Sequence, residues 1–226
     1  MRACAGGEIS DTELAALLEG VILGGALRLL GNVCLHATVL TVHGRAVALM
    51  GQSGAGKSSF ALALLRQGCR LLSDDFAALD ISGDQVLARP GRTRLRLWPD
   101  VVNRLSTGEA DVERLYPVVK GLRRFVVSAF GAVEREPTRL LAIYLLNRRV
   151  AGLNGPVIEE TMPGERLAIL AANLYGSIDP GTEARRKELA KLAKVAAAVR
   201  ACKLTLPDSL DALPSVAEHL RLRLFD

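Results

Sequence analysis

Residues 35–75 read LHATVLTVHGRAVALMGQSGAGKSSFALALLRQGCRLLSDD. Two runs of aliphatic and β-branched residues flank His43-Gly44, a pattern that predicts a β-hairpin with its turn at these two residues. The second run leads into GQSGAGKS, and the segment SFALALLRQ predicts a helix that ends near Gly68. CRLLS then predicts a short buried strand before two aspartates. This order of elements predicts an α/β fold, with a P-loop core and a mixed β-sheet flanked by helices.

The segment GQSGAGKS, residues 51–58, matches the phosphate-binding pattern G-x-x-x-x-G-K-[ST] at every defined position. Glycines permit a loop whose backbone N–H groups converge on phosphate oxygens, and the following helix adds its positive N-terminus. Lys57 can reach the outer phosphates, and Ser58 can ligate Mg²⁺. We therefore expect ATP and Mg²⁺ as cofactors. The expected cofactor-binding residues are Gly51, Ser53, Gly54, Ala55, Gly56, Lys57, Ser58 and Ser59.

Asp74 and Asp75 are the candidate acids of this site. A strand, loop, helix and strand form a right-handed parallel unit, so both strands end at the same edge of the sheet. The two aspartates should therefore lie beside Lys57 and Ser58, where a carboxylate can hold Mg²⁺ or accept the proton of a hydroxyl. We favour Asp75 as the base and Asp74 as the metal ligand or the partner of His36; the sequence itself does not rank the two.

His36 is a further catalytic candidate because of the expected hairpin register. A turn at His43-Gly44 places His36 opposite Gly51, the first residue of the phosphate-binding loop. An imidazole at that point could hydrogen-bond one of the aspartates and tune its basicity.

We expect the whole chain, residues 1–226, to form one P-loop kinase domain. Its expected parts are a helical brace at 1–31, opened by a capping box at Ser10, the nucleotide-binding core at 34–80, and C-terminal helices and a strand at 182–226. Aliphatic runs predict further strands at 85–88, 92–98, 122–130, 140–147 and 202–206. Helices are expected at 100–105, 182–200 and 214–225, and a loop at 151–166.

Two basic clusters are candidate contacts for substrate or phosphate. In RTRLRLW, residues 92–98, arginines alternate with Thr and Leu, as in a strand with one buried and one cationic face. One cluster could bind the phosphates and the other an acidic or carboxylate-bearing peptide, and a solvated strand face is the alternative. The candidate cations are Arg92, Arg94, Arg96, Lys120, Arg123 and Arg124.

Composition narrows the classes of function. Half of the 226 residues are hydrophobic, the formal net charge is +5, and residues 89–149 hold 13 Lys and Arg against 6 Asp and Glu. A basic central segment in an otherwise near-neutral chain favours a locally bound anionic ligand over nucleic-acid binding. The four separated cysteines form no zinc pattern, and the apolar stretch 14–31 carries Glu19 and Arg28. We therefore expect a cytoplasmic protein with no membrane partner.

The sequence from Cys34 to Asp80 resembles the catalytic core of HPr kinase/phosphorylase. The shared features are the His before the hairpin, the G-x-S-G-x-G-K-S loop, the helix ending in Arg-Gln-Gly and the paired aspartates. The resemblance implies a bacterial serine kinase that uses ATP and Mg²⁺, acts on a peptide or protein serine, and is a homo-oligomer. The implied active-site residues are His36, Lys57, Ser58, Asp74 and Asp75.

The chain departs from that family's regulators of sugar metabolism in three ways. The segment before the hairpin is too short for their separate N-terminal domain, Ser59 stands where Glu is usual, and the later Arg-Gly-hydrophobic-Gly-Ile stretch is not found. The reverse reaction and HPr as substrate are therefore left open. Short stand-alone homologues of this kind, with an RLRLWP-like segment, resemble the kinases that are encoded with ribosomally made peptides, including lasso peptide precursors. A serine of such a precursor peptide is therefore the expected substrate.

Other classes of P-loop protein remain as alternatives. A small-molecule kinase stays open because the loop does not identify the acceptor. A nucleotide-binding ATPase or sensor without kinase activity is disfavoured by the intact Lys57, Ser58 and acid pair. An ABC-type ATPase lacks its downstream aliphatic strand ending in Asp-Glu, and a GTPase would need Asn-Lys-x-Asp where residues 147–150 read NRRV.

Overall fold

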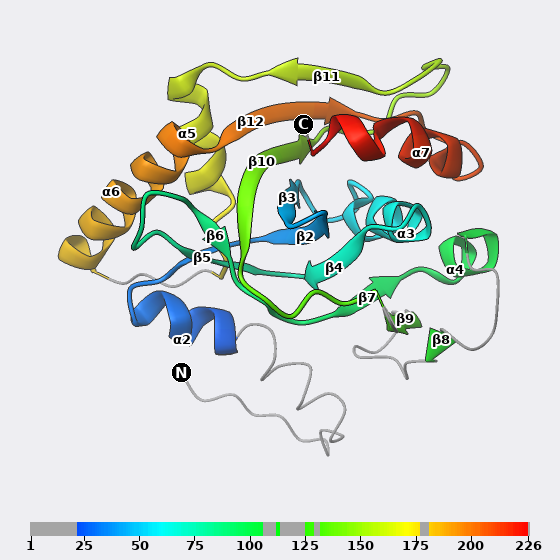
Figure 1. Ribbon diagram of the computed structural model, residues 1–226. Helices are drawn as coiled ribbons and strands as arrows, with labels where there is room; N and C mark the ends of the chain where they lie inside the picture. The colour runs from blue at the N-terminus through cyan, green and yellow to red at the C-terminus, as the bar shows by residue number, and fades with distance from the viewer. Residues whose placement is uncertain (1–21, 106–111, 114–124, 129–131, 177–180, 226) are drawn as a thin grey trace, which may run out of the picture.

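A mixed β-sheet runs through the middle of the protein (Figure 1). The computed structural model describes residues 22–105, 112–113, 125–128, 132–176 and 181–225. Within these residues the sheet consists of β1 (Val33–Leu35), β2 (Ala37–Val42), β3 (Arg45–Met50), β4 (Arg70–Ser73), β5 (Ala77–Asp80), β6 (Leu87–Ala88), β10 (Thr138–Leu146), β11 (Val157–Glu160) and β12 (Arg200–Thr205). A second, smaller sheet contains β7 (Arg94–Leu97), β8 (Val112–Glu113) and β9 (Phe125–Ser128).

The centre of the large sheet has the strand order β10-β3-β2-β4. Strand β2 is antiparallel to both β3 and β4, so β3 and β4 are parallel with β2 between them. On the other side of β3, strand β10 is parallel to β3 and β12 is parallel to β10. Four strands therefore end at one edge of the sheet.

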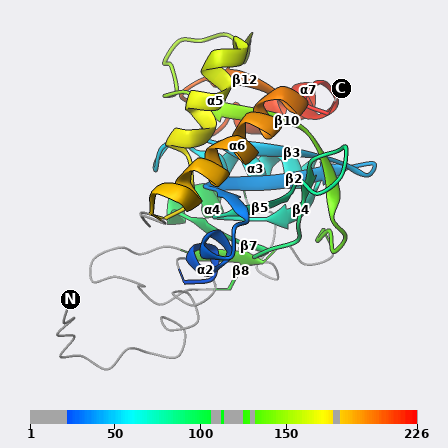
Figure 2. The same ribbon diagram turned by 90° about the vertical axis from the view of Figure 1, so that its left-hand side faces the viewer.

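Helices cover both faces of this sheet (Figure 2). The helices are α2 (Leu23–Leu29), α3 (Lys57–Arg66), α4 (Pro99–Leu105), α5 (Pro163–Ala172), α6 (Thr182–Ala198) and α7 (Leu213–Arg223). One apolar cluster joins α3, α4 and α7 to one face, and a second joins α5 and α6 to the other. Successive strand residues alternate between the clusters: Val47 and Leu49 pack towards α3, Ala48 and Met50 towards α5 and α6.

The expected α/β fold with a P-loop core is confirmed, including the hairpin register. Thr38 lies opposite Leu49, and Ala37 lies opposite Met50, immediately after His36. Strands predicted at 85–88, 92–98, 140–147 and 202–206 correspond to β6, β7, β10 and β12. The helices predicted near 100, 182 and 214 correspond to α4, α6 and α7.

Two predictions about local structure are wrong. The first strand of the hairpin was expected from Leu35 but begins at Ala37. The chain bends at His36, and the residues up to Leu35 form β1, which pairs with β5. The predicted loop at 151–166 contains β11 and the start of α5. Strand β11 is largely exposed and ends in two glutamates, so it has no apolar alternation, and the Pro that indicated a loop occupies the first turn of α5.

Several expectations concern residues outside those that the structure describes. The helical brace is described only from residue 22 onward, the capping box at Ser10 is not included, and the strand predicted at 122–130 is described only as β9. Among the described residues, Cys34, Cys69 and Cys202 are buried free thiols. None of the described helices has the length and apolar character required to cross a membrane.

Replacement of Leu64 by Ala should lower the free energy of unfolding by about 2–5 kcal/mol, because it leaves a cavity between α3 and the sheet. The Leu64 side chain is fully buried in the cluster that includes α7. The matched change Leu222→Ala, at a side chain that is 58% exposed, should alter it by about 0.5 kcal/mol or less. Chemical denaturation measures both values, and equal losses would contradict this packing.

Candidate active site

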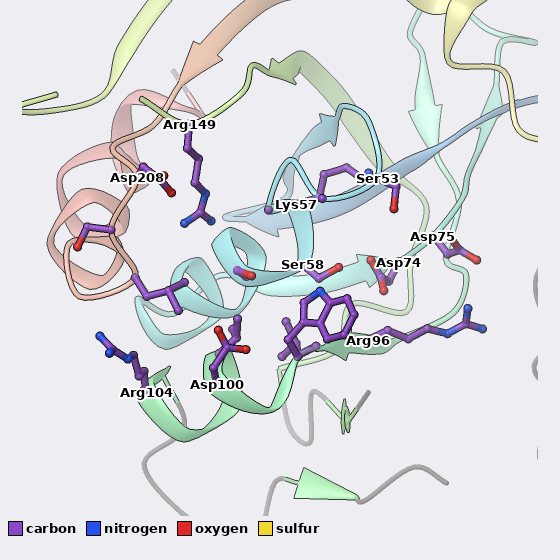
Figure 3. A pocket seen from close by; sticks show the side chains of 18 of the residues that line it. Ser53, Lys57, Ser58, Asp74, Asp75, Arg96, Asp100, Arg104, Arg149 and Asp208 are labelled. Atoms are coloured by element: carbon purple, nitrogen blue, oxygen red, sulfur yellow. The ribbon is translucent and has the colours of Figure 1, made fainter. Parts of the chain in front are cut away.

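The parallel strands bring four functional segments to one edge of the sheet. Strand β3 leads into Gly51 and the phosphate-binding loop, and β4 leads into the two aspartates. Strand β10 is followed by Arg149, and β12 is followed by Asp208. A cavity of about 830 Å³ lies at this edge, and α4 and the segment before α7 form its outer wall (Figure 3).

The phosphate-binding loop joins β3 to α3 in a geometry suited to an anion. Helix α3 begins at Lys57 after Gly56 in a left-handed conformation (φ 88°), and no side chain caps its N-terminus. The first amides of α3 are therefore open to a ligand, and the helix dipole favours negative charge there. The Lys57 ammonium folds back over the loop and donates to the Gly51 carbonyl oxygen at 2.7 Å.

Asp74 is a buried carboxylate at the end of β4. Its Oδ1 accepts a hydrogen bond of 2.7 Å from Thr38 Oγ1, and the residue is only 5% exposed. Burial raises the pKa of Asp74 to about 6, and the neighbouring charge of Asp75 acts in the same direction. A nearby cation would stabilise the charged form of this carboxylate.

Asp75 adopts a left-handed backbone conformation (φ 74°), which is uncommon for a residue with a side chain but tolerated by Asp. Its Oδ2 accepts a 3.0 Å hydrogen bond from the Tyr175 hydroxyl. Its Oδ1 lies 3.8 Å from Nδ1 of His36. The carboxylate is therefore held at the cavity wall with part of its hydrogen-bonding capacity still available.

His36 and Lys57 both lose part of their affinity for protons in this site. Burial lowers the pKa of His36, the charge of Lys57 lowers it further, and Asp75 opposes both effects. The imidazole is therefore mostly neutral at pH 7, and its approach to Asp75 is a polar contact. Burial also lowers the pKa of Lys57, while the two aspartates oppose that shift.

Arg149 and Asp208 also line the cavity, although no sequence pattern singled them out. A Cβ built on Gly56 would lie 2.9 Å from Cζ of Arg149, so the guanidinium sits directly against the loop. Burial lowers the pKa of Arg149, and the charge of Asp208 counteracts this. The sequence feature that could have identified Arg149 is the predicted strand LLAIYLLN, which two arginines follow. If this strand is parallel to β3, the two arginines must lie at the edge of the sheet that carries the phosphate-binding loop.

The structure brings most of the predicted site residues together. Those that line the cavity are His36, Ser53, Gly54, Gly56, Lys57, Ser58, Ser59, Asp74, Asp75 and Arg96. Gly51 packs against β10, and Ala55 lines a second cavity on the other side of the loop. Arg92 and Arg94 belong to the same strand region as Arg96 but lie outside the lining. Lys120, Arg123 and Arg124 fall outside the described residues.

The cavity has a donor set that suits Mg²⁺. The Ser58 hydroxyl and the Asp74 carboxylate line it together, and Asp74 is buried beside a second carboxylate. Mg²⁺ usually keeps several waters and takes only one or two protein ligands besides phosphates. Among the described residues, no three or more His, Cys, Asp or Glu side chains form a group that could hold a metal ion. A Mg²⁺ site with one or two protein ligands does not require such a group.

Fold and site together place an acid pair beside a loop of the G-x-x-x-x-G-K-[ST] pattern, at one edge of a mixed sheet. Residues 28–116 match the family described as HPr Serine kinase C-terminal domain. It is similar to the HPr kinase/phosphorylase of Prosthecochloris aestuarii, with 26% identity over 140 residues, which are 60% of this chain and 40% of the relative. The corresponding enzyme of Nitrosomonas europaea is 32% identical over 143 residues, 60% of this chain and 43% of the relative.

The chain aligns with about two fifths of the length of these curated relatives. A solved structure, titled as the Hpr(Ser) kinase/phosphatase from Coxiella burnetii, is similar over 84% of this chain and 97% of its own, with 16% identity and a TM-score of 0.40.

Replacement of Gly56 by Ala should weaken binding of an ATP analogue by about 10-fold or more. The new Cβ would displace Arg149, and the left-handed backbone would be strained. Gly44→Ala is the matched control: Gly44 also has a positive φ (72°), and a Cβ there meets nothing within 4 Å. Isothermal titration should show normal binding for the control, and equal weakening of both variants would contradict the assigned loop function.

Proposed function

We propose that this protein is an ATP-dependent kinase that transfers the γ-phosphoryl group to a serine hydroxyl of a peptide or protein. The observation that carries the proposal is the meeting of Lys57, Asp74 and Asp75 in one cavity at the N-terminus of α3. A loop that binds phosphates and a carboxylate that accepts a hydroxyl proton are the two parts that phosphoryl transfer requires. The family match over residues 28–116 supports the same reaction.

The cavity has two ends, and in-line transfer assigns one to each substrate. Asp75 and Arg96 line one end, while Arg104 and Asp208 line the other (Figure 3). His36 lies beside Asp75, and Asp211 pairs with Arg104. The attacking and leaving oxygens must lie on opposite sides of the transferred phosphorus. The acceptor serine therefore enters beside Asp75, and the nucleoside of ATP extends towards α4 and the segment before α7.

At the acceptor end, Asp75 is the proposed general base. The serine Oγ forms a bond to the γ-phosphorus while its proton passes to the Asp75 carboxylate, and the bond from the γ-phosphorus to the bridging oxygen breaks to release ADP. His36, mostly neutral, contacts Asp75 and helps to orient it. Asp74 and Ser58 are the residues that would hold Mg²⁺, which supplies charge neutralisation on the phosphate oxygens when bound.

At the nucleotide end, cations face the leaving diphosphate. Lys57 now donates to loop carbonyls and can turn to the outer phosphates, as expected for the lysine of this loop. Arg149 lies against Gly56 and is placed to contact the phosphates as negative charge develops on ADP. Beyond them, the Arg104–Asp211 ion pair of 2.7 Å joins α4 to the segment before α7 and closes the outer rim.

We infer that the acceptor is a serine-containing peptide with an acidic or carboxylate group, and that a ribosomally made precursor such as a lasso peptide is the substrate. Arg96 lines the acceptor end and provides a cation for such a group. A cytoplasmic, homo-oligomeric enzyme is the form that we propose. Small-molecule kinase activity is the competing function, because the loop does not select the acceptor.

Incubation with γ-labelled ATP, Mg²⁺ and acceptors encoded beside the gene tests the proposal. We expect label on a serine of one precursor peptide, identified by mass spectrometry. Transfer to a small metabolite alone would favour the competing function. Release of labelled phosphate with no labelled acceptor would contradict kinase activity and indicate an ATPase.

Replacement of Asp75 by Asn should lower the rate of transfer by about 100- to 10,000-fold, because the amide cannot accept the serine proton. Affinity for ATP should remain within about threefold of the original value, since the loop is unchanged. Asp80→Asn is the matched control: Asp80 pairs with Arg89 outside the cavity lining. A normal rate for the Asp75 variant would show that another group is the base.

A further inference from the structure

We propose that Tyr175 is a positioning residue of the kinase, and that its hydroxyl holds Asp75 in the orientation from which the carboxylate accepts the serine proton. The inference rests on the proposed function and extends it to a residue 100 positions further along the chain. Tyr175 hydroxyl donates to Asp75 Oδ2 at 3.0 Å. The bond occupies one carboxylate oxygen and leaves the other for His36 and the acceptor.

The backbone of Tyr175 is fixed from both sides. Its N–H donates to the carbonyl oxygen of Cys34 at 2.8 Å, and its own carbonyl oxygen accepts from Arg28 Nη1 at 2.8 Å. Arg28 is itself tied to Glu188 of α6 by a buried ion pair of 2.8 Å. The backbone of Tyr175 is therefore connected to β1, to α2 and, through Arg28, to α6.

The same backbone pairing places Tyr175 beside His36. The N–H of His36 donates to the carbonyl oxygen of Asn173 at 2.7 Å, so the segment after α5 runs along the end of β1. The rings of His36 and Tyr175 stack with centroids 5.9 Å apart and an interplanar angle of 21°. Both side chains that contact Asp75 are thus positioned by one pair of backbone segments.

The phenol ring has little room to move. A Cβ built on Gly24 of α2 would lie 2.6 Å from Cε1 of Tyr175, so the ring rests directly on the helix backbone. On another side the ring packs against Phe76, with centroids 5.3 Å apart. The hydroxyl is consequently held at a fixed point, which is the requirement for orienting another group.

The chemistry of the phenol fits this role. Burial raises the pKa of Tyr175, and the charge of Asp75 raises it further, so the hydroxyl remains a protonated donor. Asp75 has an uncommon left-handed backbone, and the Tyr175 hydroxyl donates to its carboxylate. A neutral donor orients the carboxylate without neutralising the base.

The Tyr175→Phe variant removes the hydroxyl and keeps the ring. With γ-labelled ATP and the acceptor found for the original protein, we expect kcat to fall about 3- to 10-fold, the value of one neutral hydrogen bond. KM for ATP and for the acceptor should stay unchanged. Tyr144→Phe is the matched control, since it removes a buried hydroxyl that donates to the Leu224 carbonyl oxygen; it should leave kcat unchanged.

Gly24→Ala provides a second variant that keeps the hydroxyl and displaces the ring. It should also lower kcat without raising either KM, and thermal unfolding of each variant verifies that the protein is folded. An unchanged kcat in folded Tyr175→Phe would overturn the proposal. A higher KM for the acceptor at normal kcat would do the same, since it would make Tyr175 a binding contact. If the original protein transfers no phosphoryl group, the proposed function itself fails.

Discussion

Strands β3, β4, β10 and β12 point in one direction, and the site depends on this shared polarity. Each strand contributes one segment at its carboxyl end: the phosphate-binding loop, the acid pair, Arg149 and Asp208. Strand β2 makes the arrangement possible, because it lies antiparallel between β3 and β4 and carries Thr38 to the Asp74 carboxylate. If β2 paired in another register by one residue, Thr38 would face the opposite side of the sheet.

Opposed charges share a small volume at this edge. Burial raises the pKa of Asp74 and lowers the pKa of Lys57, and the charges of Asp74 and Asp75 partly offset the shift of Lys57. Two carboxylates beside an anion-binding loop repel one another and a nucleotide unless cations lie between them. We therefore propose that a nucleotide binds together with Mg²⁺ and with Lys57 and Arg149 in contact with its phosphates.

The sequence predicts the centre of the fold because the information there is local. The glycine spacing of residues 51–58, the turn at His43-Gly44 and the aspartates after β4 all lie within one short segment. Tyr175 could not be found in this way. Its contact with Asp75 depends on pairing between the segment after α5 and β1, which are about 140 positions apart, and no periodic pattern records that pairing. Strand β11 was missed for a similar reason, since its pairing with β12 and not its own residues makes it a strand.

The most direct measurement is a crystal structure with Mg²⁺ and a non-hydrolysable ATP analogue. We expect the γ-phosphorus to lie between the Lys57 ammonium and the Asp75 carboxylate, with the nucleoside between α4 and the segment before α7. A triphosphate bound in the opposite direction, with the nucleoside beside Asp75 and His36, would contradict it.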